Sequence, residues 1–239
     1  MLGYTNAVSG VLIAILAPFL GAIADKSGRR KPWIMVFVAI MIPAIYLLWF
    51  AKKDGGGIGI YPTLGLIILI AIMFEFSAVF HNAMLPSIAP RSKVGSISGL
   101  ALALGNIGGL LLMVFVLYAF ALPGTVDWFF IPEAPLFYLD QEAEEHNRIV
   151  GPMTAIWLLV FSLPLFLFTP DGKNKTSTVK QAVSQGLKEV WTTVREVSHY
   201  SNVALYLIAR IIFNDGLVGI LIFSGVYAAG TFGWDAISL

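Results

Sequence analysis

The sequence predicts an all-α membrane protein, a bundle of helices that crosses the bilayer several times. Hydrophobic residues make up 58% of the 239 positions and charged residues only 12%, whereas soluble domains are about one-quarter charged. The apolar residues also gather into runs of about 20, the length of a helix that crosses a hydrocarbon core of about 30 Å. Water is therefore not the main solvent of this chain.

Six apolar runs are long enough to span a bilayer. We expect each to be helical, because backbone groups in hydrocarbon must satisfy their hydrogen bonds within the segment. The expected spans are residues 4–24, 33–51, 62–85, 94–122, 151–169 and 202–230. Four of them contain no Asp, Glu, Lys, Arg or His. The third contains Glu75 and His81, and the sixth contains Arg210 and Asp215.

The loops between these spans alternate in charge. Eleven Lys and Arg residues lie in loops on one side and three on the other, which also carries the acidic run at 140–145. Cytoplasmic loops retain Lys and Arg, so we predict that the basic loops are cytoplasmic. This sidedness places Met1 outside, although the first span lacks the basic start of a signal peptide. We therefore expect a further helix before Met1 and interpret the chain as an internal fragment.

Three regions follow from this arrangement. Residues 1–169 are expected to form most of an amino-terminal bundle with five spans, and 202–239 the first helix of a carboxy-terminal bundle. Residues 170–201 form a cytoplasmic linker whose apolar residues recur at helical spacing, with Thr178 and Gln181 as a capping box. This linker helix either lies on the anionic inner leaflet or packs on the bundle. The outer loop, residues 123–150, is expected to be irregular because of its prolines, with one short acidic helix near 140–147.

The first cytoplasmic loop, residues 21–32, reads GAIADKSGRRKP. A turn that is merely basic explains its Lys and Arg residues but neither the acidic residue nor the glycines. The pattern resembles the signature between the second and third helices of the major facilitator superfamily. The residues that match the signature are Gly21, Asp25, Lys26, Gly28, Arg29 and Arg30.

Asp25 stands at the end of a predicted helix, where a carboxylate meets the negative end of the helix dipole. We therefore expect a cation or the amino terminus of another helix as its partner. The resemblance implies that this loop is a conformational gate, which latches the two domains together in one of the alternating-access states. Gly21 and Gly28 would permit the close approach that this latch requires.

Residues 81–109 and 209–233 are similar to the vacuole-effluxer-type branch of that superfamily. They read HNAMLPSIAP, VGSISGL and ALGNIGG in the first stretch, and ARIIFNDG and GVYAAGTFG in the second. The branch includes autophagy-related vacuolar amino-acid effluxers of fungi and bacterial relatives. The resemblance implies a partial major facilitator fold, helices two to seven of twelve, without a cofactor. It also implies a bacterial inner or a fungal vacuolar membrane, and a small solute as substrate.

Ionisable side chains inside a span usually face a cavity or a partner. One hypothesis makes Glu75 a group that couples transport to a proton or cation, and Arg210 an anion anchor. The alternative is that each neutralises a structural charge. Arg210 and Asp215 lie about 140° apart on a regular helix, so they pair only if Asn214 and Gly216 allow a local break of the kind that transporters use.

Small residues in the fourth span predict close helix packing. Gly95 and Gly99, like Gly105 and Gly109, are four residues apart, the spacing that lets helix backbones approach. Asn106 lies among them, and it either bonds substrate or makes a hydrogen bond between helices.

Several function classes find no support in the sequence. A net charge of +1 gives no field that would attract nucleic acid, and the chain has no cysteine to supply a nucleophile or a thiolate metal ligand. His81, His146 and His199 lie apart, and neither a zinc-protease nor a hydrolase nucleophile motif is present. We predict no catalytic residue and no metal site. Secondary transport is the leading function, a transport-inactive scaffold or sensor is the alternative, and an intramembrane enzyme is third.

Overall fold

The computed structural model describes residues 2–52, 57–124, 126, 128–140, 142–172 and 200–233, with six positions between 184 and 196. The description excludes the side chains of residues 2, 22, 25–27, 221, 222 and 226. The predicted linker helix, with Thr178 and Gln181, lies mostly outside the described residues.

The described chain is almost entirely helical, as predicted. The long helices are α1 (Leu2–Ser27), α2 (Lys31–Leu47), α3 (Ile60–Ile88), α4 (Val94–Val116), α6 (Val150–Phe168) and α8 (Ser201–Phe232). A 3₁₀ turn, Leu48–Phe50, extends α2, and a π-helical turn, Leu117–Ala121, extends α4. These six stretches are long and apolar enough to cross a membrane. Their ends lie within three residues of the predicted ends, because the change from apolar to polar sequence sets both.

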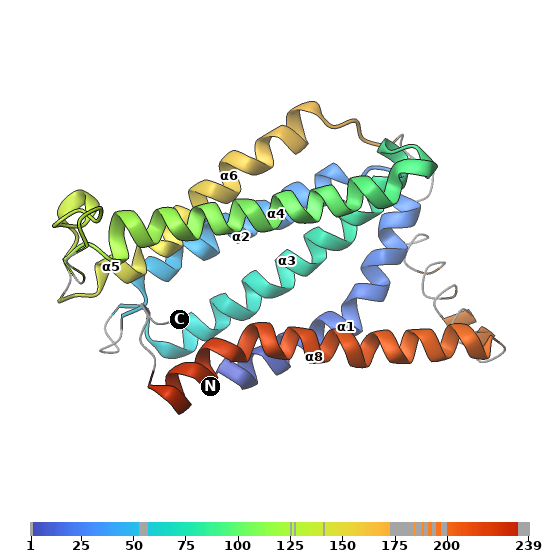
Figure 1. Ribbon diagram of the computed structural model, residues 1–239. Coiled ribbons are helices and arrows are strands. Elements are labelled where there is room, and N and C mark those ends of the chain that lie inside the picture. Colours follow the sequence, from blue (N-terminus) through green and yellow to red (C-terminus); the bar gives the residue numbers. More distant parts are fainter. Residues whose placement is uncertain are drawn as a thin grey trace. The chain divides into compact units, whose positions relative to one another are not determined.

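The chain divides into two compact units, Met1–Leu187 and Lys188–Leu239. Within the first unit, α3 packs against α1 and α2, and α2 packs against α6 (Figure 1). Its core is aromatic: the ring of Phe80 is fully buried and stacks on Trp33 at 5.5 Å between centroids. Phe37 completes this group, 5.7 Å from Phe80.

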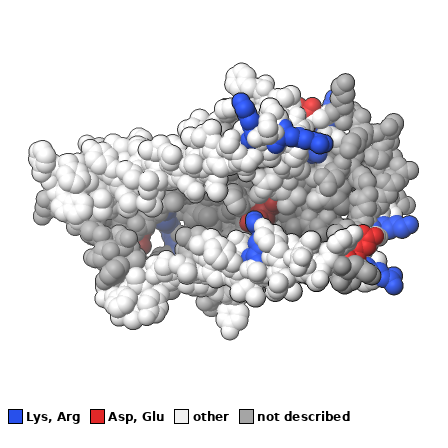
Figure 2. All heavy atoms as spheres, turned by 45° about the vertical axis from the view of Figure 1, so that its right-hand side comes forward, with Lys and Arg blue, Asp and Glu red and all other residues white. Residues whose placement is uncertain are grey.

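Apolar side chains also cover the outside of the helices. Phe161 on α6 and Leu102 on α4 expose 61% and 69% of their surface, and the described surface in Figure 2 is mostly uncharged. An apolar surface of this extent is unfavourable in water and matches the hydrocarbon of a bilayer. The fold is therefore that of a multi-pass integral membrane protein.

Loops alternate between the two ends of the first unit. In Figure 1 the turn between α1 and α2 and the start of α4 lie at one end, and the loop between α4 and α6 lies at the other. The basic residues Arg29, Arg30 and Lys31 are thus at the opposite end from Glu142, as the loop charges predict.

The short acidic helix of the outer loop is smaller than predicted. It is α5, Glu145–Arg148, and does not extend back to Asp140. The Asp140 carboxylate accepts the backbone N–H groups of Glu142 (2.9 Å) and Ala143 (3.2 Å), which favours a turn over a helix. Glu144 then adopts a left-handed backbone, with φ of 53°, and the helix begins only after it.

Candidate functional site

Gly28 shapes the turn between α1 and α2. It is buried and has a φ of 74°, a left-handed conformation that a residue with a Cβ adopts only at a cost. Glycine in this conformation commonly ends a helix. Pro32 lies in the first turn of α2, where its missing N–H removes no intrahelical hydrogen bond. The loop residues thus end one helix and begin the next.

Asp171, which follows α6, caps the amino terminus of α2. The backbone N–H of Arg30 donates to Oδ1 of Asp171 at 2.9 Å, and that of Lys31 donates to Oδ2 at 3.3 Å. N–H groups at the start of a helix have no partner within the helix, and the helix dipole favours a negative charge there. Arg30 itself makes no side-chain cap, so the cap comes from the end of another span.

Two basic side chains add hydrogen bonds to helix ends. Nζ of Lys31 donates to the carbonyl oxygen of Phe166 in the last turn of α6, at 2.8 Å. Nε of Arg30 donates to the carbonyl oxygen of Ala24 near the end of α1, at 3.4 Å. Cations at carboxy-terminal carbonyls offset the negative end of each dipole. The ends of α1, α2 and α6 are therefore joined at one point.

The backbones of Gly172 and Gly28 approach each other closely at this point. A Cβ built on Gly172 would overlap the carbonyl oxygen of Gly28. This contact lies within the first unit, and the role of Gly28 in a close approach between two domains stays a prediction. Nothing lies within 4 Å of a Cβ built on Gly21. We call this contact region the α1–α2 junction, and it comprises Gly28, Arg30, Lys31, Phe166, Asp171 and Gly172.

A pocket of about 350 Å³ lies beside the junction. Its lining carries both signs of charge and an apolar wall, and consists of Arg29, Lys31, Pro32, Met35, Phe166, Asp171 and Gly172. Asp25 and Lys26 lie in the last turn of α1, with side chains outside the described part. The predicted partner of Asp25 therefore stays a prediction.

Sequence reasoning did not single out Asp171 or Gly172. The sequence predicted a partner for the carboxylate of Asp25. The structure shows that another carboxylate, that of Asp171, caps the amino terminus of α2. The available signal was the run Pro170, Asp171 and Gly172 directly after an apolar span. The position of the acidic residue, directly after the span and between proline and glycine, is what distinguishes it.

Replacing Asp171 by alanine is expected to lower the free energy of unfolding by about 1 to 2 kcal/mol, the usual cost of losing an acidic helix cap. The measurement is the temperature at which the purified protein loses its folded form in detergent. Asp171→Asn is the matched control, since its amide oxygen still accepts one of the two hydrogen bonds and should retain part of the stability. Equal melting temperatures for wild type and Asp171→Ala would contradict the capping role.

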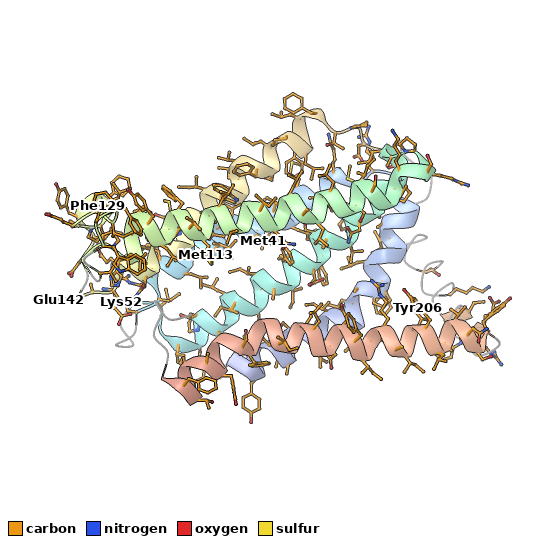
Figure 3. The ribbon with its side chains drawn as sticks, in the orientation of Figure 1. Met41, Lys52, Met113, Phe129, Glu142 and Tyr206 are labelled. Atoms are coloured by element: carbon orange, nitrogen blue, oxygen red, sulfur yellow. The ribbon has the colours of Figure 1, made fainter. Side chains whose placement is uncertain are left out.

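The predicted pathway residues lie on three helices. Glu75 is exposed near the middle of α3, and Asn106 is exposed on α4. Nη1 of Arg210 on α8 donates to the hydroxyl of Tyr206, one turn earlier, at 3.3 Å. Figure 3 labels Tyr206 on this helix.

Asn214 and Asp215 are also exposed on α8, which continues through them without a break from Ser201 to Phe232. Arg210 and Asp215 therefore stay about 140° apart. The hypothesis that Arg210 and Asp215 pair through a local break in the helix is therefore wrong.

The glycines of α4 face open space in the described structure. Nothing lies within 4 Å of a Cβ built on any of the four, Gly95, Gly99, Gly105 and Gly109. Their helix-packing role stays a prediction.

Comparison with known proteins is consistent with this architecture. All residues, 1–239, match the family described as "Vacuole effluxer Atg22 like". A curated relative, the "Uncharacterized MFS-type transporter YxiO" of Bacillus subtilis (strain 168), is 24% identical over 229 residues, which is 95% of this chain and 50% of the relative. The chain thus spans about half the length of the curated relative it matches. No solved structure matches it. With its spans and its loop between α1 and α2, the chain belongs to the family of Atg22-like vacuole effluxers.

Proposed function

We propose that the protein is a secondary transporter that moves a small solute across its membrane by alternating access. The observation that carries the proposal is the α1–α2 junction, in which the loop with the superfamily signature is tied to the end of α6 by Asp171. Membership in the family and the name of the Bacillus relative support the same function.

The junction gives the proposal a mechanical basis. Alternating access requires one helical bundle to move against another as a body around a central site. Lys31 and Asp171 join the start of α2 to the end of α6, and Arg30 adds the end of α1. Three spans fixed to one another at this end would move together, and a latch formed by residues 21–31 would act on all three.

Small solutes with an ionisable group are the substrate class to test first. Glu75 provides an acidic group at membrane depth in α3, and Arg210 a basic one in α8. Amino acids, which carry both charges, are transported by some members of the branch that the sequence resembles. We propose Glu75 as the group that couples transport to a proton or cation, and Arg210 as an anchor for a carboxylate.

Uptake by the intact protein in liposomes tests the function. Radiolabelled amino acids are supplied under an imposed proton gradient, then under a sodium gradient, with protein-free liposomes as the control. Saturable, gradient-dependent uptake is the expected result. Absence of flux for every solute and gradient, from protein that is folded in the liposomes, would favour a transport-inactive scaffold or sensor.

The absence of cysteine offers a test of the proposed sidedness. Glu142→Cys in the outer loop and Lys188→Cys in the linker both place a thiol at an exposed position. In sealed cells, a maleimide that does not cross membranes is expected to label only Glu142→Cys, and to label Lys188→Cys after the membrane is opened. The reverse pattern would place the basic loops outside.

A further inference from the structure

The outer loop carries an exposed aromatic segment that transport does not explain. We call residues 128–138 the aromatic loop. Its rings are turned outward: Phe129 is fully exposed, Tyr138 exposes 92% and Phe137 76%. Trp128, Phe130 and Leu136 are also exposed. Large apolar side chains gathered in this way on a loop mark a surface that contacts something other than water.

The aromatic loop is held in place from below. Phe120, in the π-helical turn that ends α4, is 1% exposed and stacks on the ring of Phe137, with centroids 6.2 Å apart and planes at 22°. Backbone hydrogen bonds from Ile131 to Trp128 and from Tyr138 to Pro135 close two tight turns. The segment therefore presents its outward rings from an ordered base.

Phe137 and Tyr138, at the end of the aromatic loop, have a strained backbone. Both residues have positive φ, 65° and 50°, which is uncommon for residues other than glycine and costly for bulky ones. Strain of this kind persists where the surroundings impose it and is enriched at functional positions. Two adjacent aromatic residues thus have an unfavourable backbone conformation, and most of each side chain is exposed.

The geometry points to the lipid interface as the occupant of this surface: the aromatic loop inserts into the boundary between headgroups and acyl chains, in the leaflet opposite the basic loops. Phe115 at the end of α4 and Tyr118 in the π-helical turn are exposed as well. Trp and Tyr are enriched at this depth of a bilayer because one end of each ring system is apolar and the other polar.

The composition of the aromatic loop also indicates how deep it lies in the bilayer. Glu133 is the only ionisable residue between Trp128 and Tyr138, and both its charge and the irregular backbone exclude the hydrocarbon core. Charged residues return directly afterwards, at Asp140 and Glu142. In Figure 3, Phe129 on the aromatic loop and Glu142 after it lie at the same end of the first unit as Lys52. The aromatic loop fits the interface, and the acidic segment after it fits water.

Spin labels on single cysteines test this placement, because residues 1–239 contain no cysteine and any cysteine elsewhere in the intact protein can be replaced by serine. The intact protein carrying Phe129→Cys is labelled and reconstituted in phosphatidylcholine liposomes. Collisions of the label with oxygen, which concentrates in lipid, are compared with collisions with a water-soluble nickel chelate. Glu142→Cys is the matched control, an exposed position in the acidic segment that follows the aromatic loop.

At position 129, oxygen is expected to collide more often than the chelate, and at position 142 the order should reverse. Chelate access at 129 equal to that at 142 would place the aromatic loop in water and overturn the inference. Protection of 129 from both reagents would mean that protein covers it, and would overturn it equally. Tyr138→Cys provides a second, independent position. None of these results depends on whether the protein transports a solute.

Discussion

Replacing Glu75 by glutamine is expected to reduce gradient-driven uptake by about tenfold or more while leaving the protein folded. Glutamine keeps the size of the side chain and one acceptor oxygen but cannot take up or release a proton, and a lost interaction of about 1.4 kcal/mol already changes an equilibrium tenfold. Uptake in liposomes under a proton or a sodium gradient measures the effect.

The position of Glu75 on α3 supports this expectation. The residue is exposed near the middle of the helix, while Phe80 and Met84 are buried in the core. On a regular helix Met84 points about 180° away from Glu75, so the carboxylate lies on the side of α3 that the core leaves open. Exposure of a charge to lipid at this depth costs about 3 kcal/mol, which favours a water-filled pathway or a partner instead.

Glu142→Gln is the matched control, since it removes an acidic group that is exposed in the outer loop. Its uptake should equal that of the wild type. If Glu75→Gln were as active as this control under every gradient, Glu75 would be a structural charge, the alternative that the sequence leaves open.

The spans could be predicted closely because one strong constraint decides them. Hydrocarbon admits only backbone that is hydrogen-bonded within the segment, so apolar sequence of sufficient length becomes helix regardless of its neighbours. Arg29 and Arg30 before α2, and Arg91 and Lys93 before α4, mark where each span begins. Irregular segments are governed by single side chains instead, and for this reason the carboxylate of Asp140 shortened the predicted helix of the outer loop.

The α1–α2 junction could be predicted only in part. The pattern of residues 21–31 indicated a special loop, but its cap comes from Asp171, 141 positions from Arg30. Local sequence sets where helices end, whereas packing in three dimensions sets which ends meet. The exposure of the rings of Phe129 and Tyr138 could not be predicted either, because hydropathy alone does not distinguish an apolar loop residue that is buried from one that is exposed.

Gly172→Val is expected to lower the free energy of unfolding by about 3 kcal/mol, at the upper end of the usual cost of overpacking. The first carbon of any side chain at this position would overlap the carbonyl oxygen of Gly28, and a backbone atom cannot rotate away as the tip of a side chain can. The loop must then separate from the end of α6, which also weakens the hydrogen bonds of Asp171 to α2. Gly65→Val on α3 is the matched control, because a Cβ there meets nothing within 4 Å and no packing role is predicted for this glycine. Thermal unfolding in detergent compares the two variants, and an equal, small loss of stability in both would mean that the contact between Gly172 and Gly28 is not required.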